Sequence, residues 1–264
     1  MNELLVGTSG YDYPEWKGIF YPQDLARRDF LEYYSTKFNA LELNNTFYNM
    51  PDAGRLLSFW ERSHGKIKFS IKANRLLTHE PGHDWHDRAL EFKAAVSPLM
   101  EKDCLSAILF QFPQSFGYSP DKRIYLKNLI DEFEHFPVAV EFRHRDWIRQ
   151  SVFDGLEKMN ASLVFCDMPQ LKNLPDGIGC NTPFVGPQAY IRLHGRNADA
   201  WYARGDNVSA SARYDYDYSD EELNQFVPVI NSAYQKAKIV QIFFNNHPNG
   251  NGAKNALRIR ELKG

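Results

Sequence analysis

Charged and titratable side chains recur two residues apart at several points of the sequence. Glu141 and Arg143 stand in Val-Glu-Phe-Arg, and Arg192 and His194 stand in Ile-Arg-Leu-His. Residues with this spacing project from the same face of a β-strand. The first pair places a carboxylate beside a guanidinium, and the second places a cation beside an imidazole that titrates near neutrality. With Glu42 as a second carboxylate, these groups could bind an anion and move a proton.

These residue types divide into two expected roles. Carboxylates and an imidazole suit general acid/base chemistry, whereas cations, amides and aromatic rings suit the binding of a phosphate, a carboxylate or a sugar. We expect two of the three acid/base residues, Glu141 and His194, to transfer protons, with Glu42 in support. The predicted catalytic residues are Glu141, His194 and Glu42, and the predicted substrate-binding residues are Lys72, Arg143, Arg192, Asn44, Asn245, Trp16 and Tyr11.

A divalent metal is the alternative use of the same region. The ligands would be Glu42, Glu141, Asp167, His194 and His247. The predicted cations would lie among these ligands and oppose a metal by Coulomb repulsion. The chain also lacks the His-rich ligand set of a trinuclear centre. We therefore expect no resident cofactor, with a metal-dependent hydrolase as an alternative.

Aromatic residues interleaved with arginine suggest a second alternative. They occur in a long segment, at Trp201, Tyr202, Arg204, Arg213, Tyr214, Tyr216 and Tyr218, and in an early one, at Tyr11, Tyr13, Trp16 and Tyr21. Such side chains can stack on bases and contact phosphates, as in single-stranded nucleic-acid binding. Packing of a loop on the domain rim is the ordinary alternative for each residue. Asp84, His86 and Asp87, near His79 and His83, resemble a metal cluster, but we expect them to cap a helix and face water.

Eight β-type segments alternate with segments of helical period. The expected strands are Glu3–Gly7, Ala40–Asn45, Lys66–Lys72, Ser106–Phe112, Val138–Arg143, Ser162–Asp167, Ala189–His194 and Lys238–Asn245. The expected helices are Leu25–Phe38, Arg55–His64, Trp85–Lys102, Asp121–Phe136, Asp146–Met159, a helix from Ser219 to Lys236, and Ala253–Leu262. Asp24, Ser119 with Pro120, and the capping box Ser219-Asp-Glu-Glu222 are the expected start signals.

This alternation predicts a parallel sheet with right-handed crossovers. Eight repeats in 264 residues fit an α/β protein with one (β/α)8 TIM-type barrel domain over residues 1–264, with an open doubly wound sheet as the alternative. Met168–Pro187 is rich in Pro, Gly and Asn, so we expect the sixth helix to be degenerate or missing.

Strand alternation separates an apolar helix-facing set from a polar lumen set. The helix-facing set is Leu41, Leu43, Ile67, Phe69, Ile71, Ile108, Phe110, Phe112, Val138, Val140, Phe142, Ile191, Leu193, Val240, Ile242 and Phe244. The opposite parity contains every residue of the predicted site except Trp16 and Tyr11, and also Lys68, Ser70, Gln111, Tyr190, Gln241 and His247; the parity of Asp167 is ambiguous. Its charges gather at carboxyl strand ends, where barrel active sites form. A purely architectural ion-pair network is the alternative.

Composition narrows the class of protein. The formal charge is −2, with 43% hydrophobic and 24% charged residues, which excludes a disordered chain and argues against non-specific nucleic-acid binding. Cys104, Cys166 and Cys180 lack disulfide or zinc spacing. No signal peptide or membrane helix is expected, and the simplest location is the cytoplasm. The oligomeric state is not predicted.

Six motifs in order carry a family resemblance over nearly the whole chain. They are Gly-Thr-Ser-Gly-Tyr-Asp-Tyr-Pro-Glu-Trp from Gly7, with Gly18-Ile-Phe-Tyr-Pro; Leu41-Glu-Leu-Asn-Asn-Thr-Phe-Tyr; Gln111-Phe-Pro; Val140-Glu-Phe-Arg-His-Arg-Asp-Trp; Tyr190-Ile-Arg-Leu-His-Gly-Arg-Asn; and Phe243-Phe-Asn-Asn-His, with Ala253-Lys-Asn-Ala. The sequence resembles the YecE-like family, domain of unknown function 72. The resemblance implies a (β/α)8 barrel distantly like xylose-isomerase-like barrels, including the endonuclease IV class, but no established reaction.

We therefore expect a barrel that binds a phosphorylated or otherwise anionic substrate, such as a nucleic acid or a sugar, at its carboxyl mouth. A hydrolase or lyase using acid/base catalysis is the enzymatic form of this hypothesis. The alternatives are a non-enzymatic single-stranded nucleic-acid-binding protein and a divalent-metal-dependent phosphodiester hydrolase resembling endonuclease IV. No membrane partner is expected.

Overall fold

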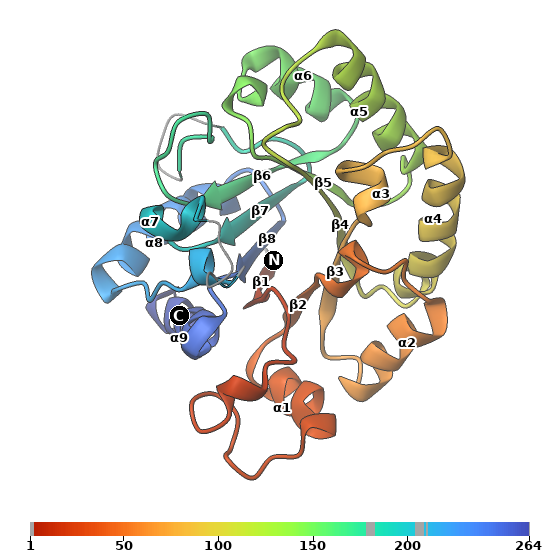
Figure 1. Cartoon of the computed structure of the whole chain (residues 1–264). Coiled ribbons are helices and arrows are strands. Elements are labelled where there is room, and N and C mark those ends of the chain that lie inside the picture. Colours follow the sequence, from red (N-terminus) through yellow and green to blue (C-terminus); the bar gives the residue numbers. More distant parts are fainter. Residues whose placement is uncertain (1–2, 178–182, 204–208, 210, 264) are drawn as a thin grey trace.

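Parallel strands surround a common axis and helices cover their outer side in the computed structural model (Figure 1). The structure describes residues 3–177, 183–203, 209 and 211–263. Within these residues, eight strands form one sheet in the order β1-β8-β7-β6-β5-β4-β3-β2. The strands are β1 (Glu3–Thr8), β2 (Ala40–Leu43), β3 (Lys68–Lys72), β4 (Leu105–Phe112), β5 (Val138–Phe142), β6 (Ser162–Asp167), β7 (Gln188–Leu193) and β8 (Ile239–Phe244). The (β/α)8 TIM-type prediction is confirmed.

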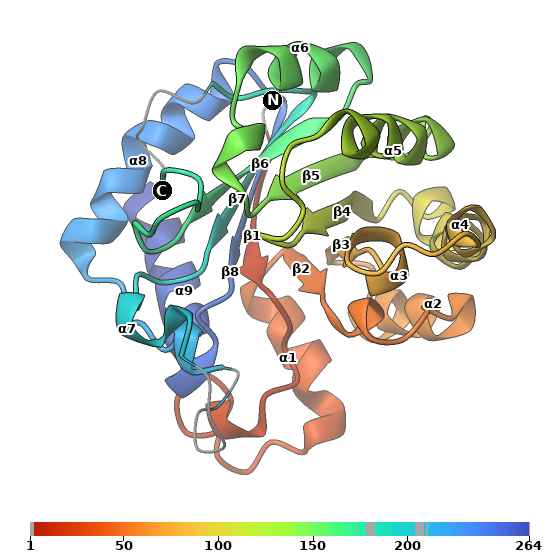
Figure 2. The ribbon, with the colours of Figure 1, turned by 45° about the horizontal axis from the view of Figure 1, so that its top comes forward.

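The helices of the described residues form an outer ring, which Figure 2 shows from a tilted direction. They are α1 (Phe30–Lys37), α2 (Ala53–Arg62), α3 (Arg75–Thr78), α4 (Trp85–Glu101), α5 (Pro120–Glu132), α6 (Gln150–Lys158), α7 (Ala198–Trp201), α8 (Asp220–Tyr234) and α9 (Asn251–Lys263). Short 3-10 turns are η1 (Pro14–Trp16), η2 (Arg27–Asp29), η3 (Asn45–Phe47), η4 (Arg145–Trp147), η5 (Ala212–Tyr214) and η6 (Pro248–Gly250). Between β6 and β7 the described residues form no helix, which confirms the degenerate sixth crossover.

Local start signals account for two of the helices. Ser119 accepts from the backbone N–H of Lys122 at the start of α5, and Ser219 and Glu222 form the complete capping box of α8. The prediction for the first helix was wrong in detail: Asp24 does not cap it, because η2 intervenes and α1 begins only at Phe30. The short helices α3 and α7 were not predicted.

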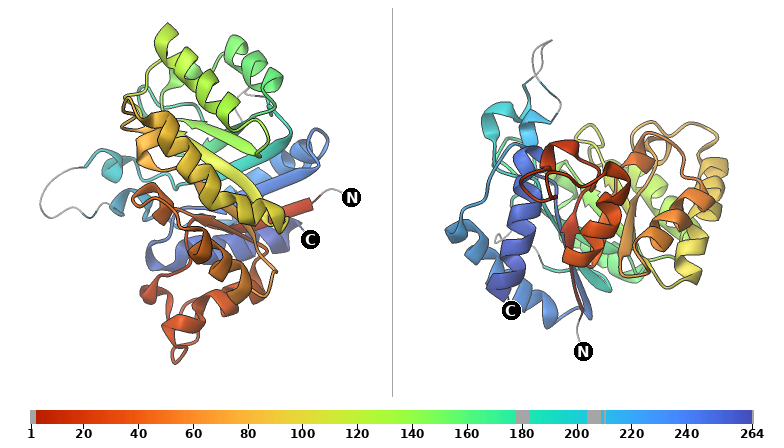
Figure 3. Two further views of the ribbon diagram at one scale, coloured as in Figure 1. Left: turned by 90° about the vertical axis from the view of Figure 1, so that its right-hand side faces the viewer. Right: turned by 90° about the horizontal axis from the view of Figure 1, so that it is seen from below.

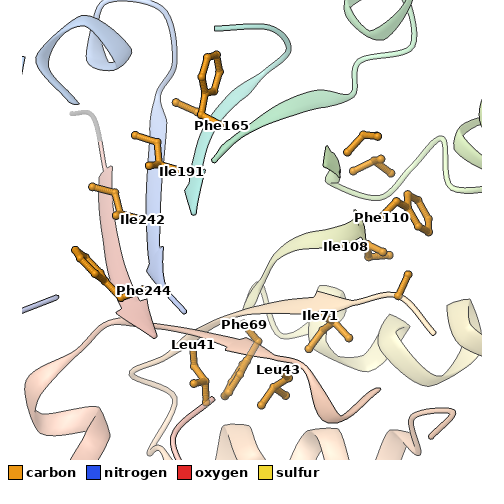
Figure 4. Packing of buried hydrophobic residues seen from close by; sticks show 14 of the residues in the cluster. Leu41, Leu43, Phe69, Ile71, Ile108, Phe110, Phe165, Ile191, Ile242 and Phe244 are labelled. Atoms are coloured by element: carbon orange, nitrogen blue, oxygen red, sulfur yellow. The ribbon is translucent and has the colours of Figure 1, made fainter. Parts of the chain in front are cut away.

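The apolar strand residues point away from the lumen toward the helices, as Figure 4 shows for Leu41, Phe69, Ile108, Ile191 and Ile242. Every residue of the predicted helix-facing set belongs to this one buried cluster. A second, smaller cluster holds strand residues of the opposite parity, among them Leu5, Leu109, Ala139 and Tyr190. The alternation of the strands therefore places polar side chains in the lumen.

The carboxyl ends of the strands lie together at one end of the barrel. In the right-hand view of Figure 3, β1 begins and α9 ends at one end of the molecule, and α7 lies at the other. Because all the paired strands are parallel, their carboxyl ends and the following loops share the end that carries α7. Residues just after β2, β3, β5, β7 and β8 can therefore meet there.

The seam between β1 and β2 is closed largely by side chains. These two strands form no ladder, and their only backbone bridge among the described residues joins Ser9 to Glu42. The backbone N–H of Thr8 donates to Tyr34 Oη at 2.8 Å, and the Tyr34 hydroxyl donates to the carbonyl of Ala40 at 3.0 Å. Asn39 accepts from the backbone N–H of Val6 and donates to Leu4 O. Two polar side chains thus take the place of strand-to-strand hydrogen bonds.

The seam predicts a specific cost for removing one hydroxyl. Tyr34→Phe leaves the N–H of Thr8 and the carbonyl of Ala40 buried without this partner, so the free energy of unfolding should fall by about 1–3 kcal/mol. Urea unfolding followed by circular dichroism measures the change. Tyr33→Phe is the matched control, because no described residue bonds its hydroxyl. Equal stability of the two variants would contradict the closure role of Tyr34.

Candidate functional site

A chain of buried ion pairs crosses the lumen. Arg192 of β7 donates to Glu42 of β2 at 2.6 Å and to Glu141 of β5 at 2.5 Å. The carboxylate side chains are fully buried and the Arg192 side chain is 2% exposed. Because a buried charge without a partner is very costly, these three side chains require one another. Their strands are not neighbours in the sheet, so the ion pairs tie distant parts of the barrel together.

Hydroxyl groups complete the surroundings of Glu42. Ser9 Oγ donates to Oε1 at 2.6 Å, and Tyr190 Oη donates to Oε2 at 2.7 Å. Ser70 Oγ lies 2.6 Å from the Tyr190 hydroxyl, so it can donate in turn. Every oxygen of Glu42 therefore has a partner. Its geometry is that of a structural anion beneath the mouth rather than a free base.

Arg143 connects the buried network to the open end of the barrel. It pairs with Glu141 and donates to His194 Nε2 at 2.9 Å, and its guanidinium lies 5.7 Å from the ring centroid of Trp201. The amide of Asn245 lies 3.0 Å from His194 Nδ1. Since Nε2 faces a guanidinium, which can only donate, the neutral imidazole accepts there and carries its proton on Nδ1.

Burial and nearby cations determine the protonation of the network. Burial, with the Arg143 and Arg192 guanidinium groups, holds the pKa of His194 well below its ordinary value. Burial by itself would raise the pKa of Glu141, but Arg143, Arg192 and His194 outweigh it and the net pKa is lowered. His194 is therefore neutral and Glu141 is ionised at pH 7. Neither group is tuned to donate a proton near neutrality.

A cavity of about 700 Å³ opens above this network at the carboxyl mouth. Its polar lining side chains are Lys72, His79, Gln111, Gln114, Ser115, Arg143, His144, Asn173 and Arg213, and its aromatic ones are Phe47, Trp201, Tyr202 and Tyr214. The predicted catalytic residues Glu141, His194 and Glu42 do not line it, nor does Arg192. The predicted site therefore separates into an accessible layer and a buried layer beneath it.

Lys72 is the unusual group of the accessible layer. Its Nζ lies 4.4 Å from the ring centroid of Phe47, and the described residues offer it no carboxylate within ion-pair distance. Burial, together with Arg192 and Arg143, lowers the pKa of Lys72 to about 7, although Glu141 and Glu42 oppose the change. Near neutrality this amine is present in both protonation states, which is the property required of an acid/base group.

His79 and His144 line the cavity, although the sequence offered no strong reason to choose them. Burial and the charge of Lys72 lower the pKa of His79 to about 4, so its imidazole is neutral at pH 7. His79 packs against Phe47 and bonds Thr78. The sequence feature that could have identified His79 is its position in the segment that follows β3, because the segments after barrel strands line the mouth.

Five of the seven predicted substrate-binding residues do not line the cavity: Arg192, which is buried beneath it, and four others. Trp16 is fully buried, and its Nε1 donates to His247 O, so it is a packing residue. Tyr11 and Asn44 line a neighbouring groove instead, because the loops after β1 and β2 turn outward. Asn245 contacts His194 but does not line the cavity. Of the predicted substrate-binding residues, only Lys72 and Arg143 line the cavity.

Two of the five residues proposed for a metal, Asp167 and His247, lie apart from Glu141 and His194. Asp167 faces outward, where it accepts from Arg196 and Tyr218, which settles its ambiguous parity. His247 stacks on Tyr13. Among the described residues one cluster has metal-ligand spacing, Glu141 with Cys166 and His194. Both oxygens of Glu141 and Nε2 of His194 already accept from arginines, so this cluster does not suit a cation.

The remaining surface predictions resolve into packing and ion pairs. Asp84 pairs with Arg88 and His86 with Glu132, so the expected helix cap at Asp84 is wrong: its side chain makes no capping bond. Trp201, Tyr218 and Tyr21 are buried, whereas Tyr202 is 50% exposed.

The two described cysteines, Cys104 and Cys166, are free thiols; Cys180 and Arg204 lie outside the described residues. None of the described helices is both long and apolar enough to cross a bilayer.

Comparisons with known proteins agree with the fold. A family model described as "Protein of unknown function DUF72" matches residues 5–264. The chain is 28% identical to UPF0759 protein YunF of Bacillus subtilis, over 98% of this chain and 94% of the relative. It is 24% identical to UPF0759 protein YecE of Escherichia coli over 62% of this chain and 59% of the relative.

Solved structures from the same family superpose on the whole barrel. A DUF72 family protein from Thermotoga maritima has a TM-score of 0.88 and 32% identity, with 98% of each chain covered. A DUF72 family protein from Enterococcus faecalis has a TM-score of 0.81 and 22% identity, with 99% of this chain and 98% of that chain covered. The second likeness supports the fold alone.

The buried network predicts a large penalty for unpairing its carboxylates. Arg192→Met should lower the free energy of unfolding by about 3–5 kcal/mol at pH 7, because two buried carboxylates lose a shared partner. The pKa of Glu141 is depressed in the folded state, so its stabilisation is present above its unfolded pKa of about 4.3 and is lost as the pH falls further. The gap between wild type and variant should therefore narrow in acid.

Urea unfolding across this pH range measures the penalty. Arg258→Met is the control, because its pair with Asp220 is exposed to solvent and should contribute little to stability. Glu42→Gln added to Arg192→Met should recover part of the loss. Equal effects of Arg192→Met and Arg258→Met would show that the ion pairs do not support the barrel.

Proposed function

The chain belongs to the DUF72 family of proteins of unknown function, and from that premise we propose that its barrel binds a phosphorylated or other anionic substrate at the carboxyl mouth. The observation that carries the proposal is Arg143. Glu141 and His194 hold its guanidinium from below, and the side chain lines the cavity above. A guanidinium in a fixed orientation binds phosphate or carboxylate with two parallel hydrogen bonds.

The charge of the cavity wall supports an anion. Lys72, Arg143 and Arg213 line it, and none of its described lining residues is Asp or Glu. Gln111 and Gln114 add neutral hydrogen-bonding groups. The aromatic side chains lie beside these cations, Phe47 next to Lys72 and Trp201 next to Arg143, and suit a sugar or a flat ring next to the anionic group. A phosphorylated small molecule matches both parts of the wall.

We assign proton transfer to Lys72 in the enzymatic form of the proposal. A neutral amine can remove a proton from substrate, and the ammonium can return one to a leaving group, as a lyase or hydrolase requires. Glu141 and His194, predicted from the sequence as the acid/base pair, become positioning residues for Arg143. The pKa values of Glu141 and His194 are lowered far from pH 7, whereas the pKa of Lys72 is about 7.

The two alternative functions receive less support from the geometry. Single-stranded nucleic-acid binding needs exposed stacking platforms, and Tyr202 is the aromatic residue of the predicted rim that is prominently exposed in the described structure. A metal-dependent phosphodiester hydrolase needs ligands free of cations, whereas arginines occupy Glu141 and His194. The small-ligand proposal uses the cavity as it stands.

Anion binding tests the proposal directly. Isothermal titration with inorganic phosphate at low ionic strength should give affinities at least about tenfold weaker for Arg143→Ala and for Lys72→Ala, since each loses a charge-assisted hydrogen bond. Arg123→Ala, on exposed α5 outside the cavity, should bind like wild type. Circular dichroism checks that each variant is folded. Unchanged phosphate affinity in both cavity variants would remove the proposal.

The pKa of Lys72 predicts an unusual dependence of stability on pH. Its folded pKa of about 7 lies below the unfolded value of about 10.4, so the folded state carries a full penalty below pH 7 that disappears as the pH rises toward 10. Lys72→Met should therefore raise the free energy of unfolding at pH 6, by a few kcal/mol at most, and have less effect at pH 10. Lys93→Met, which breaks an ion pair with Glu132, is the control and should not stabilise. A pH-independent effect of Lys72→Met would exclude a depressed pKa.

A further inference from the structure

A second cavity, of about 560 Å³, lies outside the lumen between the loop after β1, η2 and α2. Arg27, Arg28, Arg55 and Arg62 line it, whereas Asp12 is the one carboxylate among its described lining residues. This local excess of positive charge occurs in a chain with a formal charge of −2. The cavity is called the arginine groove below.

Two of the arginines are held in place by the protein. Arg27 makes a two-pronged pair with Asp12, at 2.7 and 3.0 Å. Arg62 donates to the carbonyl of Arg28 at 3.0 Å and lies close enough to the Tyr11 hydroxyl to oppose the rise that burial causes in its pKa. Side chains fixed in this way lose little further freedom when a ligand binds.

The other two arginines keep their charge available. The guanidinium of Arg55 has no carboxylate or hydrogen-bond partner among the described residues, and Arg28 has only the exposed Asp29 at 3.6 Å. Arg55 and Arg62 are seven residues apart on α2, so they project from the same face of the helix. Their charges converge on one hollow rather than spreading over the surface.

The floor of the groove is aromatic and its edge is polar. Tyr11 and Phe59 are buried side chains whose rings meet edge to face, with centroids 6.1 Å apart. Asn44 lines the groove, and its amide nitrogen donates to no described residue. A ligand held here would meet cations on its sides, apolar surface below and an amide donor at the edge.

We propose that the arginine groove binds the phosphate group of a phosphorylated small molecule. A phosphate dianion can accept from several guanidinium groups at once, and each planar guanidinium matches two of its oxygens. A nucleic-acid strand would instead require a stripe of cations along the surface. The site is distinct from the lumen cavity: η3 lies between them, with Asn45 facing the groove and Phe47 facing the lumen.

Pyrophosphate, titrated calorimetrically at low ionic strength, tests this site separately from the lumen. In the Lys72→Ala/Arg143→Ala background, one site should remain. Adding Arg55→Ala and Arg62→Ala should weaken that site at least about tenfold. Arg258→Ala with Arg260→Ala removes two charges from α9, outside both cavities, and should leave it unchanged. Circular dichroism confirms folding of each variant.

Several results would overturn the inference. Full pyrophosphate binding without Arg55 and Arg62, or an equal loss in the α9 control, would show that the groove is not the site. Tighter binding of citrate than of pyrophosphate would replace phosphate by a carboxylate ligand. Binding of a single-stranded oligonucleotide that needs Arg55 and Arg62, with no binding of pyrophosphate, would replace the small molecule by a strand. If the wild type and the Lys72→Ala/Arg143→Ala variant bind pyrophosphate equally at one site, the lumen does not bind it. That result would count against the proposed function and would leave the inference about the arginine groove intact.

Discussion

The ion pairs of Arg192 with Glu42 and Glu141 are the constraint on which this barrel depends. An ordinary barrel lumen is filled with branched apolar side chains, whereas here three strands contribute charge to a fully buried layer. Charges in such a place are tolerated only when each has a partner. These pairings therefore fix the positions of β2, β5 and β7 relative to one another. The hydroxyl groups of Ser9 and Tyr190 supply the remaining hydrogen bonds of Glu42.

The same layer determines the chemistry of the cavity above it. Glu141 is already shared by Arg143 and Arg192, so it cannot also neutralise Lys72. Burial, together with the two arginines, lowers the pKa of His194 and the pKa of Lys72. The ion pairs that hold the strands together therefore also contribute to the electrostatic environment of the cavity. The architectural explanation accounts for the buried layer, whereas the proposed site concerns the cavity above it.

Much of the fold could be predicted from the sequence, because alternation in a strand fixes which side chains share a face. That rule placed the helix-facing layer, and it placed Glu141 and Arg192 in the lumen. It does not give depth along the barrel axis, so it could not tell that Arg143 is accessible and Glu141 is not. Loop residues carry no such periodicity: Trp16 entered the core and Asn44 turned outward. The Tyr34 seam depends on contacts between α1 and two strands, which no local pattern encodes.

The charge balance of the lumen also bears on how a ligand would act there. Two carboxylates face two arginines, and Lys72 is the additional group whose charge the protein leaves uncompensated. Under the proposed function, a bound anion supplies the missing negative charge and raises the pKa of Lys72. Between pH 7 and the raised pKa, binding therefore takes up a proton, and the amine becomes an acid beside the substrate. The free protein holds Lys72 poised between its two states because only the ligand completes the charge balance.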